Sequence, residues 1–180
     1  MRVITGTARG VRLTTPDGLS TRPTAERIKE ALFSAIQFEI EGRSVLDLFA
    51  GSGQLGVEAL SRGAESAVFV DVGKTPVACI RENLSKTKLE DRATVVQSDY
   101  LSYLGICRRK FGLIFLDPPY DGKMLETALD KIIAFDILSS GGIIVAERPA
   151  GKDLDAQYQG YVRSRDYRYG KTLVAIYRKE

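Results

Sequence analysis

FGLIFLDPPY, at residues 111–120, decides the fold class of this chain and indicates its chemistry. Residues 111–116 are almost entirely apolar, which is typical of a strand buried on both faces of a parallel sheet. Asp117-Pro118-Pro119-Tyr120 then falls at the carboxyl end of that strand, where open α/β sheets bind their ligands. The pattern predicts a functional site there, although D-P-P is also turn chemistry and the segment could be a proline-rich turn.

Strand-like and helical segments alternate along the chain. We expect strands at 44–49, 67–70, 93–97, 112–116 and 143–146, separated by helices near 54–62, 75–88 and 123–135. A hairpin at 3–6 and 10–14 and a helix capped by Thr24 precede them, and 161–167 with 172–177 form a closing antiparallel hairpin. This order predicts an α/β doubly wound, mainly parallel seven-stranded sheet. The 180 residues would form one domain, with an N-terminal extension at 1–40 and a core at 41–180.

Composition excludes several classes of function. The chain has no histidine, and its two cysteines, Cys79 and Cys107, lack C-x-x-C spacing. A zinc site, a disulfide framework and a histidine-based triad are therefore not expected, and we predict no metal. Because there is no apolar run near 18 residues and no signal-peptide pattern, we expect a cytoplasmic protein without a membrane partner.

The net charge of +3 is unevenly distributed. Residues 1–29 carry +4 and residues 160–180 carry +4, which leaves −5 for the middle of the chain. Two basic ends favour contact with a polyanion. Basic residues that protect a solvated sheet edge from pairing are the alternative explanation.

DLFAGSGQLG, at residues 47–56, closes the first strand of the expected sheet. Gly51, Gly53 and Gly56 satisfy G-x-G-x-x-G, and Asp71 follows Gly51 by twenty residues, as in dinucleotide-binding sites. A nicotinamide or flavin dinucleotide is thus one hypothesis. Asp47 argues against it, because a carboxylate at the mouth of the loop would repel a pyrophosphate but attract an ammonium group. S-adenosylmethionine carries an ammonium and a sulfonium and no phosphate, so we predict it as the cofactor, with Asp71 on its ribose hydroxyls.

Two further groups complete the expected site. Asp99 follows the third strand and could accept a hydrogen bond from the adenine amine, beside an edge contact from Tyr100. A role of Asp99 as a helix N-cap is compatible with this contact. In the D-P-P-Y segment, Asp117 and the Pro118 carbonyl could each accept a hydrogen bond from an exocyclic amine, and Tyr120 offers a flat face on which a base can stack.

The motifs together resemble a known family. Asp47-x-Phe49-x-Gly51-x-Gly53 with the later D-P-P-Y resembles the class I S-adenosylmethionine-dependent amino-methyltransferases. The RsmD family in particular is resembled by Arg2-Val3-Ile4-x-Gly6, Thr21-Arg22-Pro23-Thr24, the helix at 27–33, and residues 48–53 with Gly56 and 58–64. That family methylates the N2 amine of one guanine in small-subunit ribosomal RNA. The likeness spans essentially the whole chain.

The resemblance implies a Rossmann-like class I methyltransferase fold and assigns roles residue by residue. Catalytic residues would be Asp117, Pro118, Pro119 and Tyr120. The cofactor would contact Asp47, Phe49, Ala50, Gly51, Gly53, Asp71, Asp99 and Tyr100, with the turn at 22–24 near its amino-acid end. The resemblance also implies ribosomal RNA, the small subunit or an assembly intermediate as the partner, bound by a monomer. The charge of the N-terminal segment, not the resemblance, leads us to expect RNA contacts from Arg2, Arg9, Arg12 and Arg22.

One departure and three alternatives accompany this resemblance. Relatives usually end the second strand with Glu and carry another acid two residues later, whereas here Asp71 is followed by Val72 and Gly73. The target could instead be an adenine N6 amine of DNA or RNA. A protein glutamine is a third target, although enzymes of that kind usually carry Asn where Asp117 stands. Finally, the chain could be a catalytically silent RNA-binding or ribosome-assembly module.

Overall fold

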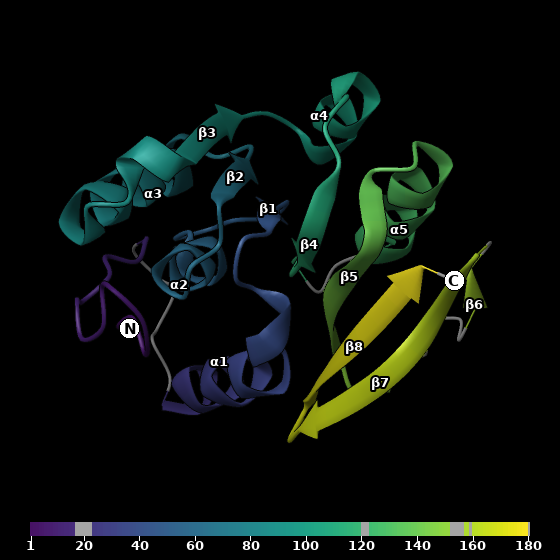
Figure 1. Ribbon diagram of the computed structural model, residues 1–180, viewed down its shortest axis with the longest axis horizontal. Helices are drawn as coiled ribbons and strands as arrows, with labels where there is room; N and C mark the ends of the chain where they lie inside the picture. Colours follow the sequence, from purple (N-terminus) through teal and green to yellow (C-terminus); the bar gives the residue numbers. More distant parts are fainter. Residues whose placement is uncertain (17–22, 120–122, 152–156, 159, 180) are drawn as a thin grey trace.

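The computed structural model is an eight-stranded mixed sheet with helices on both faces (Figure 1). It describes residues 1–16, 23–119, 123–151, 157–158 and 160–179. The strand order is β3-β2-β1-β4-β5-β8-β7-β6. The first five are parallel: β1 (Ser44–Asp47), β2 (Ser66–Asp71), β3 (Ala93–Gln97), β4 (Phe111–Leu116) and β5 (Leu138–Pro149). The last three pair antiparallel: β6 (Gln157–Tyr158), β7 (Tyr161–Tyr169) and β8 (Thr172–Lys179).

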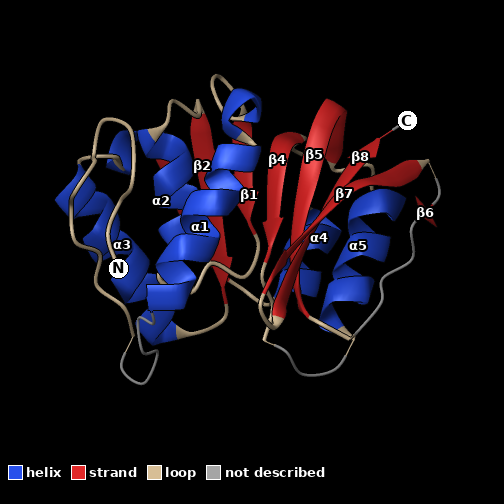
Figure 2. Cartoon of the chain, turned by 90° about the horizontal axis from the view of Figure 1, so that it is seen from below, coloured by secondary structure: helices blue, strands red, loops and turns tan. Residues whose placement is uncertain are grey.

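The helices form two layers around the sheet, as Figure 2 shows. Side chains from α1 (Pro23–Ala35), α2 (Gln54–Ser61) and α3 (Lys74–Thr87) pack in one hydrophobic core, and those from α4 (Tyr100–Ile106) and α5 (Met124–Ala134) pack in another. Strand residues alternate between the two cores: Phe115 of β4 faces the first, and Ile114 faces the second. Burial on both faces explains why β4 is a continuous apolar run.

The predicted fold class is confirmed, and three details differ. The predicted seven strands are present, and the eighth strand is the two-residue β6 at the edge. Thr24 does not cap the first helix, because α1 begins at Pro23, a residue suited to the first helical position. The same helix ends at Ala35, and a short 3-10 turn at Gln37–Glu39 follows it. The third difference is α4, which the sequence pattern did not predict.

The N-terminal segment, residues 1–16, lies outside the main sheet. It makes one antiparallel bridge, Arg2 with Arg12, and backbone hydrogen bonds such as Val3 N–H to the Val11 carbonyl at 3.0 Å. The expected hairpin therefore exists only as a short, hairpin-like loop. Figure 1 shows it beside α2 and α3, at the left of the molecule.

Two buried polar residues fasten this segment to the helices beneath it. Glu58 of α2 has no exposed surface, and its carboxylate accepts hydrogen bonds from Ile4 N–H at 2.8 Å and Thr5 N–H at 3.0 Å. Asn83 of α3 is equally buried; it accepts from Thr14 N–H at 2.7 Å and donates to the Thr14 carbonyl at 2.8 Å. The segment is thus held at both ends by groups that would be costly to leave unpaired.

Along the described part of the chain, no helix has both the length and the apolar character that crossing a membrane requires.

Candidate active site

A pocket of about 560 Å³ lies where the parallel strands end. Its walls come from the loops that follow β1, β2, β3 and β4, and from the N-terminal segment. Because the chain winds outward from β1 in one direction and from β4 in the other, these two central strands form the switch point of the sheet. Ligands of doubly wound folds bind in the crevice at such a point.

The glycine loop after β1 has the backbone that its motif predicts. Gly51 and Gly53 have φ of +54° and +75°, in the left-handed region that favours glycine. Gly56 serves packing, because a Cβ there would lie 2.3 Å from the Phe69 ring of β2. The glycines therefore let the loop turn sharply and let α2 lie close to the sheet.

Asp47 is a buried carboxylate at the end of β1. Its side chain lines the pocket, the residue is only 2% exposed, and its Oδ2 accepts a hydrogen bond from Gly56 N–H at 3.0 Å. Burial raises the pKa of Asp47 to about 7, opposed by the Gly56 hydrogen bond and reinforced by the charge of Asp71. Among the described residues no lysine or arginine pairs with it. A cationic ligand group would relieve this unfavourable burial.

Asp71, at the end of β2, binds backbone N–H groups of the loops that follow β1 and β2. Its two oxygens accept hydrogen bonds from Gly51 N–H at 2.9 Å and Gly73 N–H at 2.8 Å. Each oxygen keeps a further lone pair, so the carboxylate can also accept from the hydroxyls of a ribose. The family that the sequence resembles usually carries a second acid at the position of Gly73. Glycine stands there in this chain, and a Cβ at that position would lie 2.8 Å from Pro76.

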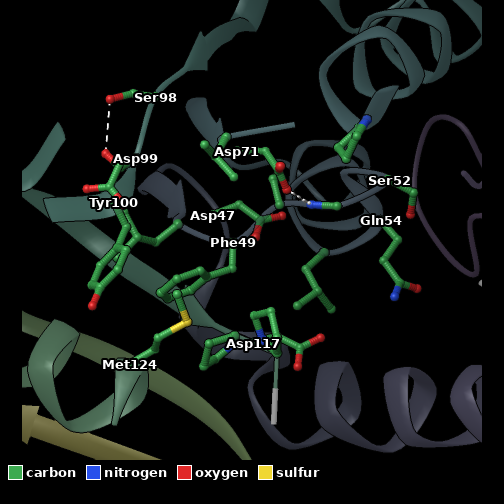
Figure 3. Close-up of a pocket in the computed structure, with 18 of the residues that line it drawn as sticks. Asp47, Phe49, Ser52, Gln54, Asp71, Ser98, Asp99, Tyr100, Asp117 and Met124 are labelled. Atoms are coloured by element: carbon green, nitrogen blue, oxygen red, sulfur yellow. Dashed lines mark hydrogen bonds between the residues drawn. The ribbon is translucent and has the colours of Figure 1, made fainter. Parts of the chain in front are cut away.

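Asp99 and Tyr100 form one end of the pocket (Figure 3). Asp99 is the N-cap of α4, and its Oδ1 accepts from Leu101 N–H at 2.9 Å and from Ser102 N–H at 3.1 Å. The N-cap interpretation is confirmed, and no described residue donates a hydrogen bond to the second carboxylate oxygen. The Tyr100 and Phe49 rings meet at 5.1 Å between centroids, which gives this end an aromatic wall.

Asp117, Pro118 and Pro119 line the same pocket, directly after β4. The pKa of Asp117 is raised well above its ordinary value, mainly by burial and further by the charges of Glu147 and Asp47. A carboxyl group with a raised pKa binds a proton more readily than an exposed aspartate does. Tyr120, predicted as the stacking residue, lies outside the described residues.

The pocket brings together most of the residues that the sequence predicted. Those that line it are Asp47, Phe49, Ala50, Gly51, Asp71, Asp99, Tyr100, Asp117, Pro118 and Pro119. Gly53 instead lies behind the loop, where a Cβ would meet Ile80 at 3.2 Å. The side chains of Arg2, Arg9 and Arg12 are exposed outside the pocket, and Arg22 lies outside the described residues.

Sequence reasoning missed several residues of the lining. Ser52, Gln54 and Leu55 occupy the variable positions of the glycine motif. Their membership of that motif could have predicted that they line the pocket. Met1 and Thr15 also line the pocket, and no local pattern marks them. Their position follows from the fastening of the N-terminal segment by Glu58 and Asn83.

The chain is similar to known proteins over nearly its whole length. Residues 1–178 match the family model described as Conserved hypothetical protein 95. YlbH of Bacillus subtilis, by its name an rRNA methyltransferase candidate, is 41% identical over 182 residues that cover 99% of both chains. An Escherichia coli protein named Ribosomal RNA small subunit methyltransferase D is 31% identical, over 100% of this chain and 90% of its own.

Solved structures show the same architecture. A methyltransferase candidate from Escherichia coli, yhhF, superposes with a TM-score of 0.91 at 32% identity and covers 100% of this chain and 98% of its own. A methylase candidate from Haemophilus influenzae gives a TM-score of 0.83 at 29% identity, over 99% and 97% of the two chains. Matched by its family model almost from end to end, and similar over its full length to these relatives, the chain belongs to the RsmD family of methyltransferases.

Proposed function

We propose that the protein transfers a methyl group from S-adenosylmethionine to the exocyclic N2 amine of a guanine in small-subunit (16S) ribosomal RNA. One observation carries the proposal: two kinds of group line the same pocket. The buried carboxylate of Asp47 can pair with a cation, and the Asp117 carboxylate and the Pro118 carbonyl can accept hydrogen bonds from an amine. The names of the relatives support ribosomal RNA as the substrate class. The guanine N2 amine is the target that the family resemblance implies.

The residues of the pocket fit S-adenosylmethionine better than a dinucleotide. Asp47, Asp71, Asp99 and Asp117 all contribute to its lining, and none of the described residues that line it is lysine or arginine. Such a pocket disfavours a pyrophosphate and favours a cofactor with an ammonium and a sulfonium group. Asp47 suits the ammonium, Asp71 the ribose hydroxyls and Asp99 the adenine amine.

The protein's part in the reaction is to position the amine and to receive its proton. When bound, S-adenosylmethionine supplies a methyl group on an electron-poor sulfur. Asp117 and the Pro118 carbonyl accept hydrogen bonds from the two amine hydrogens, which leaves the nitrogen lone pair available for in-line attack. Holding both reactants in one pocket accounts for most of the reduction in the activation barrier. The amine becomes acidic only after it has gained the methyl group, and the raised pKa of Asp117 suits it to take the proton then.

A transfer assay tests the proposed function directly. Protein is incubated with methyl-tritiated S-adenosylmethionine and either deproteinised 16S RNA or assembled small subunits, and the labelled nucleoside is identified by digestion and mass spectrometry. We expect N2-methylguanosine in one of the two substrates. N6-methyladenosine would replace the proposed target with the adenine alternative. RNA binding without any transfer would favour the silent-module alternative.

The cofactor assignment predicts a loss of affinity in Asp47→Asn. Removing the charge that pairs with the ammonium should weaken S-adenosylmethionine binding by roughly 1–3 kcal/mol, and neither form should bind NAD. Because the ammonium selects the ionised carboxylate, affinity of the unmutated protein should fall below about pH 7, by up to about tenfold per pH unit. Calorimetry over roughly pH 5.5–8.5 should show that slope, and the Asn variant should lack it.

The same variant should be more stable than the unmutated protein when no ligand is present. With its pKa raised from 3.8 to about 7, Asp47 keeps a proton in the folded state that the unfolded chain has released. Stability of the ligand-free protein therefore falls as pH rises through this range, and the Asp47→Asn variant would avoid that loss.

Tight NAD binding by the unmutated protein, with no binding of S-adenosylmethionine, would contradict the cofactor assignment.

A second prediction concerns the RNA surface. The guanidinium groups of Arg2, Arg9 and Arg12 are exposed and make no hydrogen bond or ion pair with any described residue. They lie on the segment that also supplies Met1 and Thr15 to the pocket wall. Reversing the three arginines to Glu should weaken RNA binding and flatten its salt dependence by roughly 0.7–0.9 log units per lost phosphate contact. Affinity for S-adenosylmethionine should stay the same.

The C-terminal arginines provide the matched control. Arg163 lies 3.5 Å from the Asp166 carboxylate, Arg165 donates to the Tyr167 hydroxyl at 3.3 Å, and Arg168 donates to the Gly170 carbonyl at 3.4 Å. Because local contacts already engage them, their reversal to Glu should change RNA binding less. If binding is lost only in the C-terminal variant, the RNA surface is at the other end of the chain.

A further inference from the structure

The side chain of Gln54 is an unsatisfied polar group inside the pocket. Gln54 is the first residue of α2 and lines the pocket, and its Oε1 is buried with no hydrogen-bond partner among the residues that the structure describes. Its amide makes no hydrogen bond with any described residue, and no side chain caps the start of α2. Because a buried amide oxygen without a partner destabilises the folded protein, a ligand that supplies a hydrogen-bond donor is the simplest reason for its placement.

The position of Gln54 indicates which part of the cofactor it meets. Figure 3 shows Asp99 and Tyr100 at one end of the pocket and Ser52 and Gln54 at the other, with Asp71 between them. The proposed adenine contact is at the Asp99 end and the proposed ribose contact is at Asp71. A cofactor that lies along the pocket in this direction extends its amino-acid end toward Gln54.

The chemistry of that end matches an amide. An amino acid carries an ammonium, which only donates hydrogen bonds, and a carboxylate, which only accepts them. Asp47 can pair with the ammonium but would repel the carboxylate, and no described lysine or arginine lines the pocket to offset this. A carboxamide has one acceptor and one donor group, so Gln54 can bind both without adding charge. A glutamate in its place would bind only the ammonium.

We propose that Gln54 positions the amino-acid end of S-adenosylmethionine, with Nε2 donating to the α-carboxylate and Oε1 accepting from the α-ammonium. This assignment rests on the proposed function and adds a residue to its site. Gln54 touches the cofactor at a distance from the reacting methyl group, so it acts on affinity and orientation.

Two ligands that differ only at the relevant end test the proposal. S-adenosylhomocysteine has the amino-acid end, and 5′-methylthioadenosine has the same adenosine and sulfur without it. In Gln54→Met, which keeps the shape but not the hydrogen bonds, calorimetry should show about tenfold weaker binding of S-adenosylhomocysteine. Binding of 5′-methylthioadenosine should stay within about twofold, which also shows that the variant is folded.

A second variant and a control sharpen the result. Gln54→Glu should weaken S-adenosylhomocysteine more than Gln54→Met does, because it places a negative charge beside the carboxylate. Gln37→Met, at an exposed glutamine that does not line the pocket, should change neither affinity. The inference is wrong if Gln54→Met binds S-adenosylhomocysteine like the unmutated protein, if it loses both ligands equally, or if Gln54→Glu binds as tightly as the unmutated protein. If the unmutated protein binds neither ligand, the proposed function fails first and this inference with it.

Discussion

Asp117→Ala should lower the rate of methyl transfer by about two orders of magnitude or more, with affinity for S-adenosylmethionine nearly unchanged. The carboxylate follows β4 directly and lines the pocket, and its pKa is raised by burial. In the proposed mechanism it accepts a hydrogen bond from the reacting amine, an interaction that matters most as the nitrogen becomes pyramidal. The alanine variant would keep the pocket but lose this acceptor and the later acceptor of the proton.

Single-turnover transfer from tritiated S-adenosylmethionine, together with calorimetry of the cofactor, separates the two effects. Asp130→Ala, at an exposed aspartate of α5, is the matched control and should keep full activity. Asp117→Asn, which retains one acceptor oxygen but cannot take the proton, should fall between the alanine variant and the unmutated protein. Full activity in Asp117→Ala would mean that D-P-P-Y is a proline-rich turn and that the proposed mechanism is wrong.

The sequence predicted the parallel half of the sheet well because its elements are simple in pattern. The strand at 93–97 has the predicted bounds, and β4 begins one residue before the predicted one. Here each strand is a short apolar run, and the helices between them follow helical spacing. The predictions at 54–62 and 75–88 each differ from the observed helix by one residue at one or both ends.

The pattern failed where structure depends on partners distant in sequence. β5 was expected at 143–146 but spans Leu138–Pro149. Its last three residues, Glu147, Arg148 and Pro149, have no strand pattern and are in the strand because they pair with β8. The missed α4 has only seven residues, too few for helical periodicity to show, although its cap Asp99 was visible.

The candidate site also contains both residues that the sequence could predict and residues that it could not. Asp47, Asp71, Asp99 and Asp117 could be predicted together, because each lies at or just after the carboxyl end of a parallel strand and these ends meet at one edge. Met1 could not, since its place in the wall depends on where the N-terminal segment packs. That packing is determined by polar groups on α2 and α3 whose burial no local pattern reveals.

Glu58→Ala should lower the free energy of unfolding by about 3–5 kcal/mol, a loss typical of breaking a buried ion pair. The carboxylate is fully buried, lies 3.4 Å from Lys29 Nζ and 2.8 Å from Arg62 Nε, and accepts from Ile4 and Thr5 N–H. Burial lowers the pKa of Lys29, and Glu58 opposes that shift. Without Glu58, the buried Lys29 ammonium loses its counter-charge and keeps its hydrogen bond to the Arg2 carbonyl at 2.7 Å, while two backbone donors lose their acceptor.

Denaturant unfolding measures this loss, with Glu65→Ala at an exposed position as a control that should stay within about 0.5 kcal/mol of the unmutated protein. Adding Lys29→Met to Glu58→Ala should recover only part of the loss, because it removes a buried charge without a counter-charge but also removes the hydrogen bond of Lys29 to the Arg2 carbonyl. Because Met1 and Thr15 reach the pocket only through the fastened segment, Glu58→Ala should also weaken S-adenosylmethionine binding, whereas Glu65→Ala should not. A Glu58→Ala protein that unfolds and binds cofactor like the unmutated one would mean that the N-terminal segment is held by its other contacts, among them the hydrogen bonds of Asn83 to Thr14 and of Ser61 to Thr5 and Ala8. In that case the wall of the pocket would owe its position to these hydrogen bonds and to Val3, Ala8 and Leu13, which are buried in the core beside α1 and α2.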